Sequence, residues 1–269
     1  MAGPEPKSLA SGKLRLDFPA DHVARLTIDH PAKRNALDHE LLDAFAAELP
    51  QIEARCLLIT ATGSVFSAGY DIGNLQDADA IAEAESLVAH PFHAAIGALD
   101  AFPFPAVAAL NGHAIGGGLE LALSCDLRLA VAEARLGMPP ARLGLVYSHT
   151  GLRKFIDVIG VARTRELFYT ARSVTAQRAY EWGLVNELAD AGELERRAVD
   201  YAARIAANAP LSLRGNKRVI GALLAAEGAL DERVSRELVE LREACFRTQD
   251  FAEGVRAFGE KRAPRWRGA

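Results

Sequence analysis

The chain has 269 residues, half of them apolar, which is enough to bury a sizeable core as one α/β domain or as one domain with a helical extension. A formal net charge of −4 at pH 7 gives no electrostatic attraction for nucleic acid. Three cysteines without a Cys-x-x-Cys spacing suggest neither a disulfide framework nor a zinc site. There is no signal-peptide core and no apolar run near the roughly 20 residues that span a bilayer. We expect a cytoplasmic protein that binds neither nucleic acid nor membrane, with residues 1–12 disordered.

Hydrophobic period predicts alternating strands and helices up to about residue 190. Alternating polarity indicates two paired strands, short apolar runs indicate three buried ones, and helices lie between them. Asp38 is the expected N-cap of the first helix. The predicted strands are 13–18, 22–29, 56–61, 105–110 and 127–132, and the predicted helices are 39–49 and 86–102. This order is typical of repeated β-β-α units.

Beyond Gly192 the pattern predicts helices alone. Amphipathic runs cover 193–209, 211–226, 231–248 and 251–262. With no strand of their own to cover, such helices pack over the first domain or against a neighbouring subunit. We therefore expect an α/β core over 13–191 and a helical region over 192–269 that forms oligomers.

Three consecutive glycines, Gly116 to Gly118, are followed by Leu119 and Glu120 in "IGGGLELALS". Glycine costs about 1 kcal/mol relative to alanine inside a helix, so the position needs bare backbone. A helix N-terminus without Cβ atoms suits an anion or a developing oxyanion. The alternative is a tight turn that packs closely on a sheet.

A second stretch of small residues follows an apolar strand in "GSVFSAGYD". It is not the nucleophile turn of a serine hydrolase, because Val65 stands where Gly-x-Ser-x-Gly needs glycine. Ligand sites of α/β proteins gather at the carboxyl ends of strands. Two such backbone sites could together hold one thioester oxygen.

"FSAGYDI" together with "NGHAIGGGLELALSCDLRLA" resembles the enoyl-CoA hydratase/isomerase (crotonase) family, and further matches run from about residue 13 to 265. The resemblance implies an α/β, ClpP/crotonase-like spiral of β-β-α units with a helical C-terminal region that builds a homotrimer or a dimer of trimers. It also implies an acyl-CoA substrate whose thioester enolate is held by two peptide N–H groups. Coenzyme A is then part of the substrate, and no separate cofactor or metal is expected.

Carried over residue by residue, the resemblance makes Ala68 and Gly117 the N–H donors and Glu120 the acid or base at the acyl α-carbon. Tyr147 is a further catalytic candidate. The residues expected to contact the substrate or its CoA are Arg34, Ala36, Ala68, Tyr70, Asp71, Ile72, Gly116, Gly117, Pro140, His149, Phe258 and Lys261, the last two on a neighbouring subunit's CoA.

The second glutamate of the hydratases is missing, because Pro140 occupies its position and no Asp or Glu occurs between Arg135 and Ile156. Isomerisation needs one carboxylate, Glu120, and hydration could use Glu120 with Tyr147, His149 or a positioned water. Decarboxylation of a malonyl-type thioester needs no base. "ARLGLVYSHTG" resembles a segment of the methylmalonyl-CoA decarboxylases, although those have histidine where this chain has Tyr70. On that ground proton transfer through Glu120 is favoured over decarboxylation.

A non-catalytic acyl-CoA-binding protein is the remaining alternative, and the carboxylate of Glu120 among leucines argues against it. Tyr147 and His149 either line the acyl pocket or cap the helix that follows. Tyr70 either borders the pocket or stacks at a loop edge. His90 and His93 have no third ligand nearby, so we do not expect a metal there.

Overall fold

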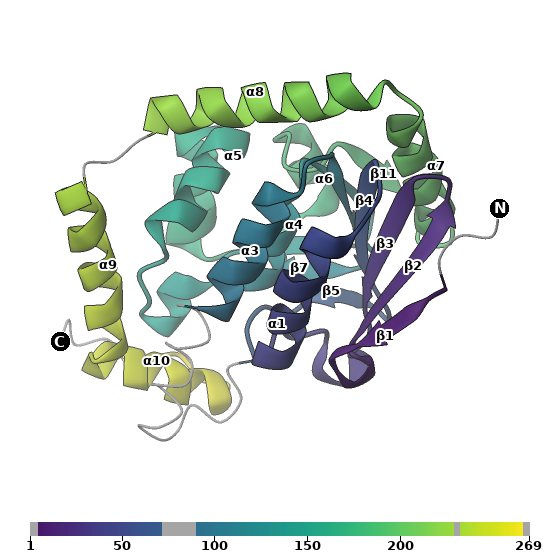
Figure 1. The fold of residues 1–269 in the computed structure, drawn as a ribbon. Helices are drawn as coiled ribbons and strands as arrows, with labels where there is room; N and C mark the ends of the chain where they lie inside the picture. Colours follow the sequence, from purple (N-terminus) through teal and green to yellow (C-terminus); the bar gives the residue numbers. More distant parts are fainter. Residues whose placement is uncertain (1–4, 72–89, 229–231, 266–269) are drawn as a thin grey trace.

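A computed structural model describes residues 5–71, 90–228 and 232–265 (Figure 1). Within them the strands form two sheets. The larger has the order β1-β2-β3-β4-β6-β8-β11, built from β1 (Lys7–Leu9), β2 (Leu14–Ala20), β3 (Val23–Ile28), β4 (Cys56–Ala61), β6 (Ala106–Leu110), β8 (Leu127–Val131) and β11 (Glu187–Ala189). The smaller has the order β10-β9-β7-β5, from β10 (Val174–Thr175), β9 (Arg135–Gly137), β7 (His113–Ile115) and β5 (Val65–Ser67).

The large sheet is parallel from β3 to β11, and β1 and β2 join it antiparallel. Parallel neighbours need long crossover connections, which the helices supply. The buried strands predicted from apolar runs are confirmed, and β4 has the predicted bounds. Its side chains are buried on both faces, which explains why it reads as a continuous apolar run.

Helices cover both faces of the large sheet (Figure 1). They are α1 (His39–Glu48), α3 (Pro91–Ala101), α4 (Gly117–Ser124), α5 (His149–Thr170), α6 (Ala176–Glu181), α7 (Leu194–Ala206), α8 (Pro210–Gly228), α9 (Glu232–Phe246) and α10 (Gln249–Gly259). α7 packs on β2, β3, β4, β6 and β8, while α1 and α3 pack together on the opposite side. The predicted N-cap of α1 is confirmed, since Asp38 accepts a hydrogen bond of 2.9 Å from the N–H of Leu41.

The C-terminal region is helical throughout its described part, as predicted. Of its helices, α7 covers the sheet and so belongs to the core, whereas α8 runs along the top of the molecule in Figure 1. Five large apolar side chains of α8 are exposed: Leu211, Val219, Ile220, Leu223 and Leu224. Assembly into trimers stays a prediction.

The expected disorder of residues 1–12 is wrong for Lys7 to Gly12. Lys7–Leu9 pairs antiparallel with Leu14–Leu16, and the Lys7 ammonium lies 2.6 Å from the Glu48 carboxylate. Backbone pairing within a short hairpin orders this segment despite its polar sequence. Residues 1–4 lie outside the described residues.

In the described part of the chain, no helix is both long and apolar enough to cross a membrane. The same residues contain no group of three or more His, Cys, Asp or Glu side chains arranged to hold a metal ion.

Candidate active site

The glycine-rich segment forms the start of α4, which contacts β5, β6, β7 and β8 and therefore lies between the two sheets. Gly116 is its N-cap, with φ +57° and ψ −127°, a conformation that favours glycine. No side chain caps this helix. Gly117 is its first residue, so the Gly117 N–H has no acceptor within the helix and lies at the positive end of the helix dipole.

Close packing requires the next two glycines. A Cβ on Gly118 would lie 2.5 Å from the Cβ of Ser67, and one on Gly117 would lie 2.8 Å from Cε1 of Tyr70. Close packing, the alternative offered by the sequence, is therefore confirmed for these two glycines, while the binding of an oxyanion at the helix start stays a prediction. Gly118 is a close-packing residue, while Gly116 and Gly117 leave the helix start bare.

In the turn after β5, one of the two predicted N–H donors to the thioester oxygen is wrong. The N–H of Ala68 donates a 3.0 Å hydrogen bond to the carbonyl of Arg34, so it is not directed at a ligand. The Gly69 carbonyl accepts from the N–H of Leu37 at 2.8 Å. Because a trans peptide points its C=O and N–H in opposite directions, the N–H of Tyr70 points away from Leu37.

This turn lies against the start of α4. Gly69 has φ +94°, and a Cβ there would stand 2.9 Å from the carbonyl oxygen of Ile115 and 3.3 Å from the nitrogen of Gly117. The peptide that carries the Tyr70 N–H is thus the neighbour of Gly117. The two small-residue segments meet, as the sequence predicted, but through a different peptide.

Glu120 lies one helical turn beyond Gly117 and is only 5% exposed. Its Oε2 accepts a short hydrogen bond from the Tyr147 hydroxyl. Burial is the largest cause that raises the pKa of Tyr147 well above 10, followed by the charge of Glu120 and the neighbouring Tyr70. The phenol therefore stays protonated and remains a donor to the carboxylate. Sequence reasoning named both residues, and the structure pairs them.

The start of α5 completes the surroundings of Glu120. Ser148 is the N-cap, and its Oγ accepts from the N–H of Gly151 at 3.1 Å. The capping role considered for Tyr147 and His149 therefore belongs to Ser148. A Cβ on Gly151 would lie 2.7 Å from Glu120 Oε1 and 2.7 Å from Tyr147 Cε1. Sequence analysis missed Gly151, whose signal is a glycine in the first turn of a helix that follows a serine cap.

Aromatic rings surround the pair. The ring of Tyr70 meets Phe92 edge-on with centroids 5.0 Å apart, and the ring of Tyr147 meets Phe168 at 5.4 Å. Phe168 in turn meets Phe155 at 5.1 Å. Tyr70 is half-buried on Gly117 and Phe92 rather than stacked at a loop edge.

The loop before α1 was expected to contact CoA. Arg34 is exposed with φ +52°, and Ala36 is buried. Between them Asn35 is fully buried. Its amide donates to the carbonyls of Thr62 and Val65 at 2.8 and 2.7 Å, so it fixes this loop against β5. Asn35 is a second residue whose role the sequence did not reveal.

The other residues expected to contact the substrate or its CoA lie in different environments. The N–H of Asp71 donates to the Leu37 carbonyl at 2.9 Å, and Ile72 lies outside the described residues. Pro140 is buried at the start of the 3-10 turn Pro140–Leu143. Phe258 and Lys261 are exposed at the end of α10. Their contacts with CoA remain predictions.

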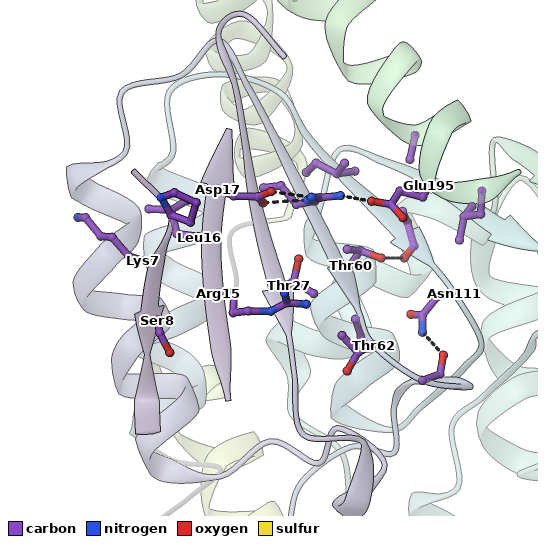
Figure 2. Close-up of a pocket in the computed structure, with 18 of the residues that line it drawn as sticks. Lys7, Ser8, Arg15, Leu16, Asp17, Thr27, Thr60, Thr62, Asn111 and Glu195 are labelled. Carbon is purple, nitrogen blue, oxygen red and sulfur yellow. Dashed lines mark hydrogen bonds and ion pairs between the residues drawn. The ribbon is translucent and has the colours of Figure 1, made fainter. Parts of the chain in front are cut away.

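A cavity of about 670 Å³ lies elsewhere, on the face of the large sheet beside α7 (Figure 2). Three of its charged groups pair with one another, since Arg25 contacts Asp17 at 2.5 Å and Glu195 at 2.6 Å. Among the described residues that line it, none belongs to the predicted site.

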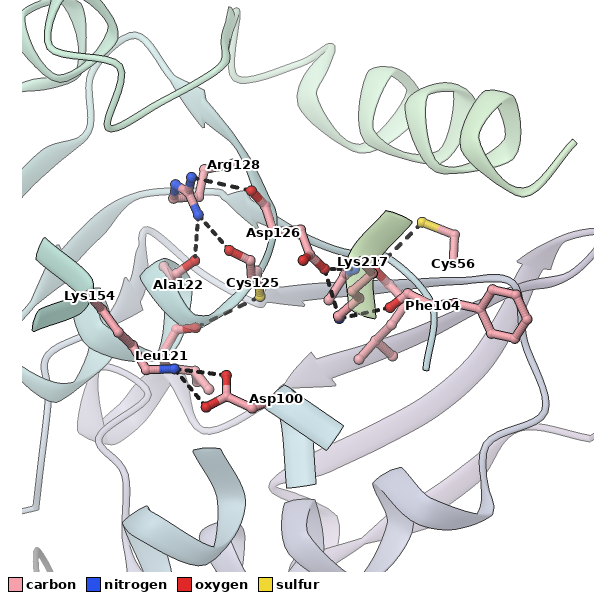
Figure 3. A network of polar contacts seen from close by, with 12 residues as sticks. Cys56, Asp100, Phe104, Leu121, Ala122, Cys125, Asp126, Arg128, Lys154 and Lys217 are labelled. Carbon is pink, nitrogen blue, oxygen red and sulfur yellow. Dashed lines mark hydrogen bonds and ion pairs between the residues drawn. The ribbon is translucent and has the colours of Figure 1, made fainter. Parts of the chain in front are cut away.

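The far end of α4 is closed by a buried arginine (Figure 3). Arg128 donates to the carbonyls of Cys125 at 2.6 Å and Leu184 at 2.7 Å. Nearby, Lys217 of α8 contacts Asp126 at 2.9 Å. Burial raises the pKa of the Cys56 and Cys125 thiols to about 12, so neither is a reactive thiolate at neutral pH.

A model of the family described as enoyl-CoA hydratase/isomerase matches residues 20–269. The chain belongs to this family. The short-chain-enoyl-CoA hydratase of Clostridium acetobutylicum is 31% identical over 89% of this chain and 92% of its own length. YngF of Bacillus subtilis, which is named in the enoyl-CoA hydratase/isomerase class, is 37% identical over 92% of this chain and 95% of its own.

Solved structures of family members have the same fold. A methylmalonyl-CoA decarboxylase in complex with 2-nitronate-propionyl-CoA superposes with a TM-score of 0.85 at 27% identity, over 96% of this chain and 99% of its own. The crotonase-like α/β fold expected from the sequence is confirmed.

Proposed function

We propose that this family member acts on acyl-CoA thioesters through an enolate, and that it decarboxylates a malonyl-type thioester. In this reaction the bond from C2 to the carboxylate carbon breaks and carbon dioxide leaves. The electron pair moves to C2 and the thioester oxygen, and a proton from water then adds to C2. The hydrogen bond from Tyr147 to Glu120 is the observation that carries the choice of reaction.

The enolate oxygen would lie between the N–H groups of Gly117 and Tyr70, in place of the Gly117 and Ala68 pair expected from the sequence. Gly117 is supported as a donor by its place at the uncapped start of α4. Tyr70 is supported by the direction of its peptide, which the bond between Gly69 and Leu37 fixes. Such a donor contributes roughly 3 to 4 kcal/mol to the transition state in other enzymes.

Hydration is the less suitable reaction for this site. It is served best by two carboxylates that act on one water, and the buried Pro140 stands where the family's second glutamate is expected. One oxygen of Glu120 accepts the hydrogen bond from Tyr147. The other lies so close to the backbone of Gly151 that a Cβ there would be only 2.7 Å away. Such a carboxylate has little freedom to move between carbon atoms or to position water.

Decarboxylation makes use of the same restraint. A substrate carboxylate near Tyr147 would meet a hydroxyl already committed to Glu120, and it would face the negative charge of that residue. Negative charge is disfavoured beside Glu120 and favoured at the start of α4. When carbon dioxide leaves, the negative charge moves from the substrate carboxylate to the thioester oxygen, and therefore toward the start of α4. The similarity to a methylmalonyl-CoA decarboxylase agrees with this proposal.

Double-bond isomerisation with Glu120 as the base at C2, which the sequence favoured over decarboxylation, is here the second candidate. Its support is the buried position of Glu120 one turn beyond Gly117, from which a carboxylate can reach back toward the α-carbon. Hydration with Glu120 assisted by Tyr147 or His149 belongs to the same candidate. A buried carboxylate without a catalytic role would be costly, which speaks against a protein that only binds acyl-CoA.

The test incubates the purified protein with malonyl-, methylmalonyl-, ethylmalonyl-, 2-enoyl- and 3-enoyl-CoA. Mass changes report the loss of carbon dioxide or the addition of water, and NMR reports double-bond isomerisation, which leaves the mass unchanged. We expect carbon dioxide loss from a malonyl-type thioester. Glu120→Gln keeps an acceptor for Tyr147 and should retain this rate within about tenfold, because no base is needed. If Glu120 is instead the C2 base of an isomerase, the same change should cost roughly 100-fold or more.

Tyr147→Phe should slow carbon dioxide loss about 10- to 100-fold, since it leaves the buried carboxylate without its donor. Tyr169→Phe is the matched control, because Tyr169 is exposed on α5. Conversion of enoyl-CoA with no loss of carbon dioxide from any malonyl-type thioester would contradict the proposal and favour the second candidate.

A further inference from the structure

The geometry points to Tyr70 as the residue that limits the acyl group, so that this protein takes short-chain acyl-CoA thioesters with no more than a methyl or ethyl group on C2. This inference rests on the proposed function, because it places the acyl group between Gly117 and Glu120. It adds a substrate class and the residue that sets it.

One edge of the Tyr70 ring lies on the proposed oxygen-binding site. Its Cε1, Cζ and Cδ1 atoms are 2.8, 2.9 and 3.2 Å from the point where a Cβ of Gly117 would stand. The ring therefore occupies the space directly over the start of α4. A thioester whose oxygen binds at the Gly117 N–H has this ring as its immediate neighbour.

Tyr70 is also close enough to Tyr147 to contribute to the raised pKa of that phenol, and Tyr147 donates to Glu120. Tyr70 therefore spans the distance from the oxygen site to the carboxylate that faces C2. In the proposed binding mode, a group on C2 that extends away from α4 would meet this ring, as far as the described residues show. One side chain therefore borders both the oxygen site and the space beside C2.

The ring is supported from behind by the core. Phe92 meets it edge-on at 5.0 Å and is itself 2% exposed. Tyr147 rests on Phe168, which rests on the fully buried Phe155. Since packed cores do not yield to extra methylenes without strain, the limit is firm.

The experiment measures binding of acetyl-, propionyl-, butyryl-, hexanoyl- and octanoyl-CoA by isothermal titration calorimetry. These saturated thioesters undergo no decarboxylation, so the result does not depend on turnover. For the wild type we expect the dissociation constant to rise at least tenfold from butyryl- to hexanoyl-CoA. In Tyr70→Ala this rise should disappear, and affinity should increase by up to about fourfold for each methylene that enters the opened space.

Tyr70→Phe is the matched control, because it keeps the ring and loses only the hydroxyl; it should keep the wild-type limit. Tyr70→Leu should give an intermediate limit and serves if Tyr70→Ala does not fold. Tyr180→Ala, on the exposed face of α6, should change nothing.

Wild-type protein that binds octanoyl-CoA as tightly as propionyl-CoA would overturn the inference, and so would an unchanged limit in folded Tyr70→Ala and Tyr70→Leu. The chain-length limit can hold while no malonyl-type thioester is decarboxylated, in which case only the proposed reaction fails. Absence of binding by every acyl-CoA would overturn both.

Discussion

The starts of two helices, α4 and α5, lie beside the carboxylate of Glu120, and they are built differently. α5 begins with a serine whose hydroxyl accepts from the backbone of Gly151. α4 begins with Gly116 and has no side-chain cap. One N–H of the first turn of α5 is therefore capped by a side chain of the protein, whereas α4 has no such cap at the end that the proposed function assigns to the enolate oxygen.

The two starts also use glycine for different ends. Gly151 makes room for a carboxylate of the protein itself, since a side chain there would collide with Glu120. Gly117 makes room for the ring of Tyr70 at the first position of α4. Changing each glycine separately therefore tests each function.

The largest effect is expected at α4. Gly117→Pro removes the N–H, and we expect turnover to fall roughly 100- to 1,000-fold. The measurement is steady-state kinetics with the thioester that reacts in the substrate test proposed above.

The proline also introduces a Cβ that would meet the Tyr70 ring at 2.8 Å, so a control is needed. Gly117→Ala introduces the same Cβ and keeps the N–H. Turnover of the proline variant should be at least tenfold below that of the alanine variant. Equal rates in the two folded variants would mean that this N–H does not serve the reaction.

A smaller effect is expected at α5. Gly151→Ala places a Cβ 2.7 Å from Glu120 Oε1 and must displace the carboxylate or the helix start. Because Glu120→Gln is expected to retain the decarboxylation rate within about tenfold, we expect Gly151→Ala to lower kcat by no more than about tenfold. A loss near the roughly 100-fold that misplacement of a catalytic group can cost would favour Glu120 as the C2 base.

Gly97→Ala on α3 is the matched control, because a Cβ there meets no atom within 4 Å among the described residues. It should leave kcat unchanged. A Gly151→Ala variant as active as Gly97→Ala would show that Glu120 tolerates displacement and is not held by the start of α5.

The smallest effect concerns the pair itself at high pH. The folded protein holds the Tyr147 proton more tightly than the unfolded chain, whose tyrosines titrate near pH 10. The stability that comes from this neutral phenol is complete below pH 10 and decreases as the pH rises further, by at most about 1.4 kcal/mol per pH unit. Urea unfolding at pH 9, 10 and 11 should show a steeper decline for the wild type than for Tyr147→Phe. Parallel declines would mean that the phenol ionises as freely in the folded protein as in the unfolded chain.

Much of the fold could be predicted from the sequence, because buried parallel strands and capped helices carry strong local signals. The run "CLLITA" predicted β4 with its observed bounds, and Asp38 predicted the start of α1. Lys7–Leu9 was missed, since its order comes from pairing with β2 rather than from its own composition. The strands of the smaller sheet after β5 are two or three residues long and show no clear period.

For the site, the sequence named Gly117, Glu120 and Tyr147, but not how they fit together. Ala68 was assigned as a donor because a motif gives residue types and not the direction of each peptide. That direction is fixed by Leu37 and Arg34, which lie about thirty residues earlier in the chain. Gly151 was missed for a similar reason, because the need for space at a helix start appears only when the partner carboxylate is in place.

α4 has eight residues, fewer than the roughly 12 to 15 that an isolated helix needs to persist in water. The dipole of α4 therefore depends on burial between the two sheets and on Arg128, which donates a hydrogen bond to the Cys125 carbonyl at the C-terminal end of the helix. The orienting field at Gly117 is a property of the packed core rather than of a local segment. Loss of the site and loss of the core are, on this account, one cooperative event.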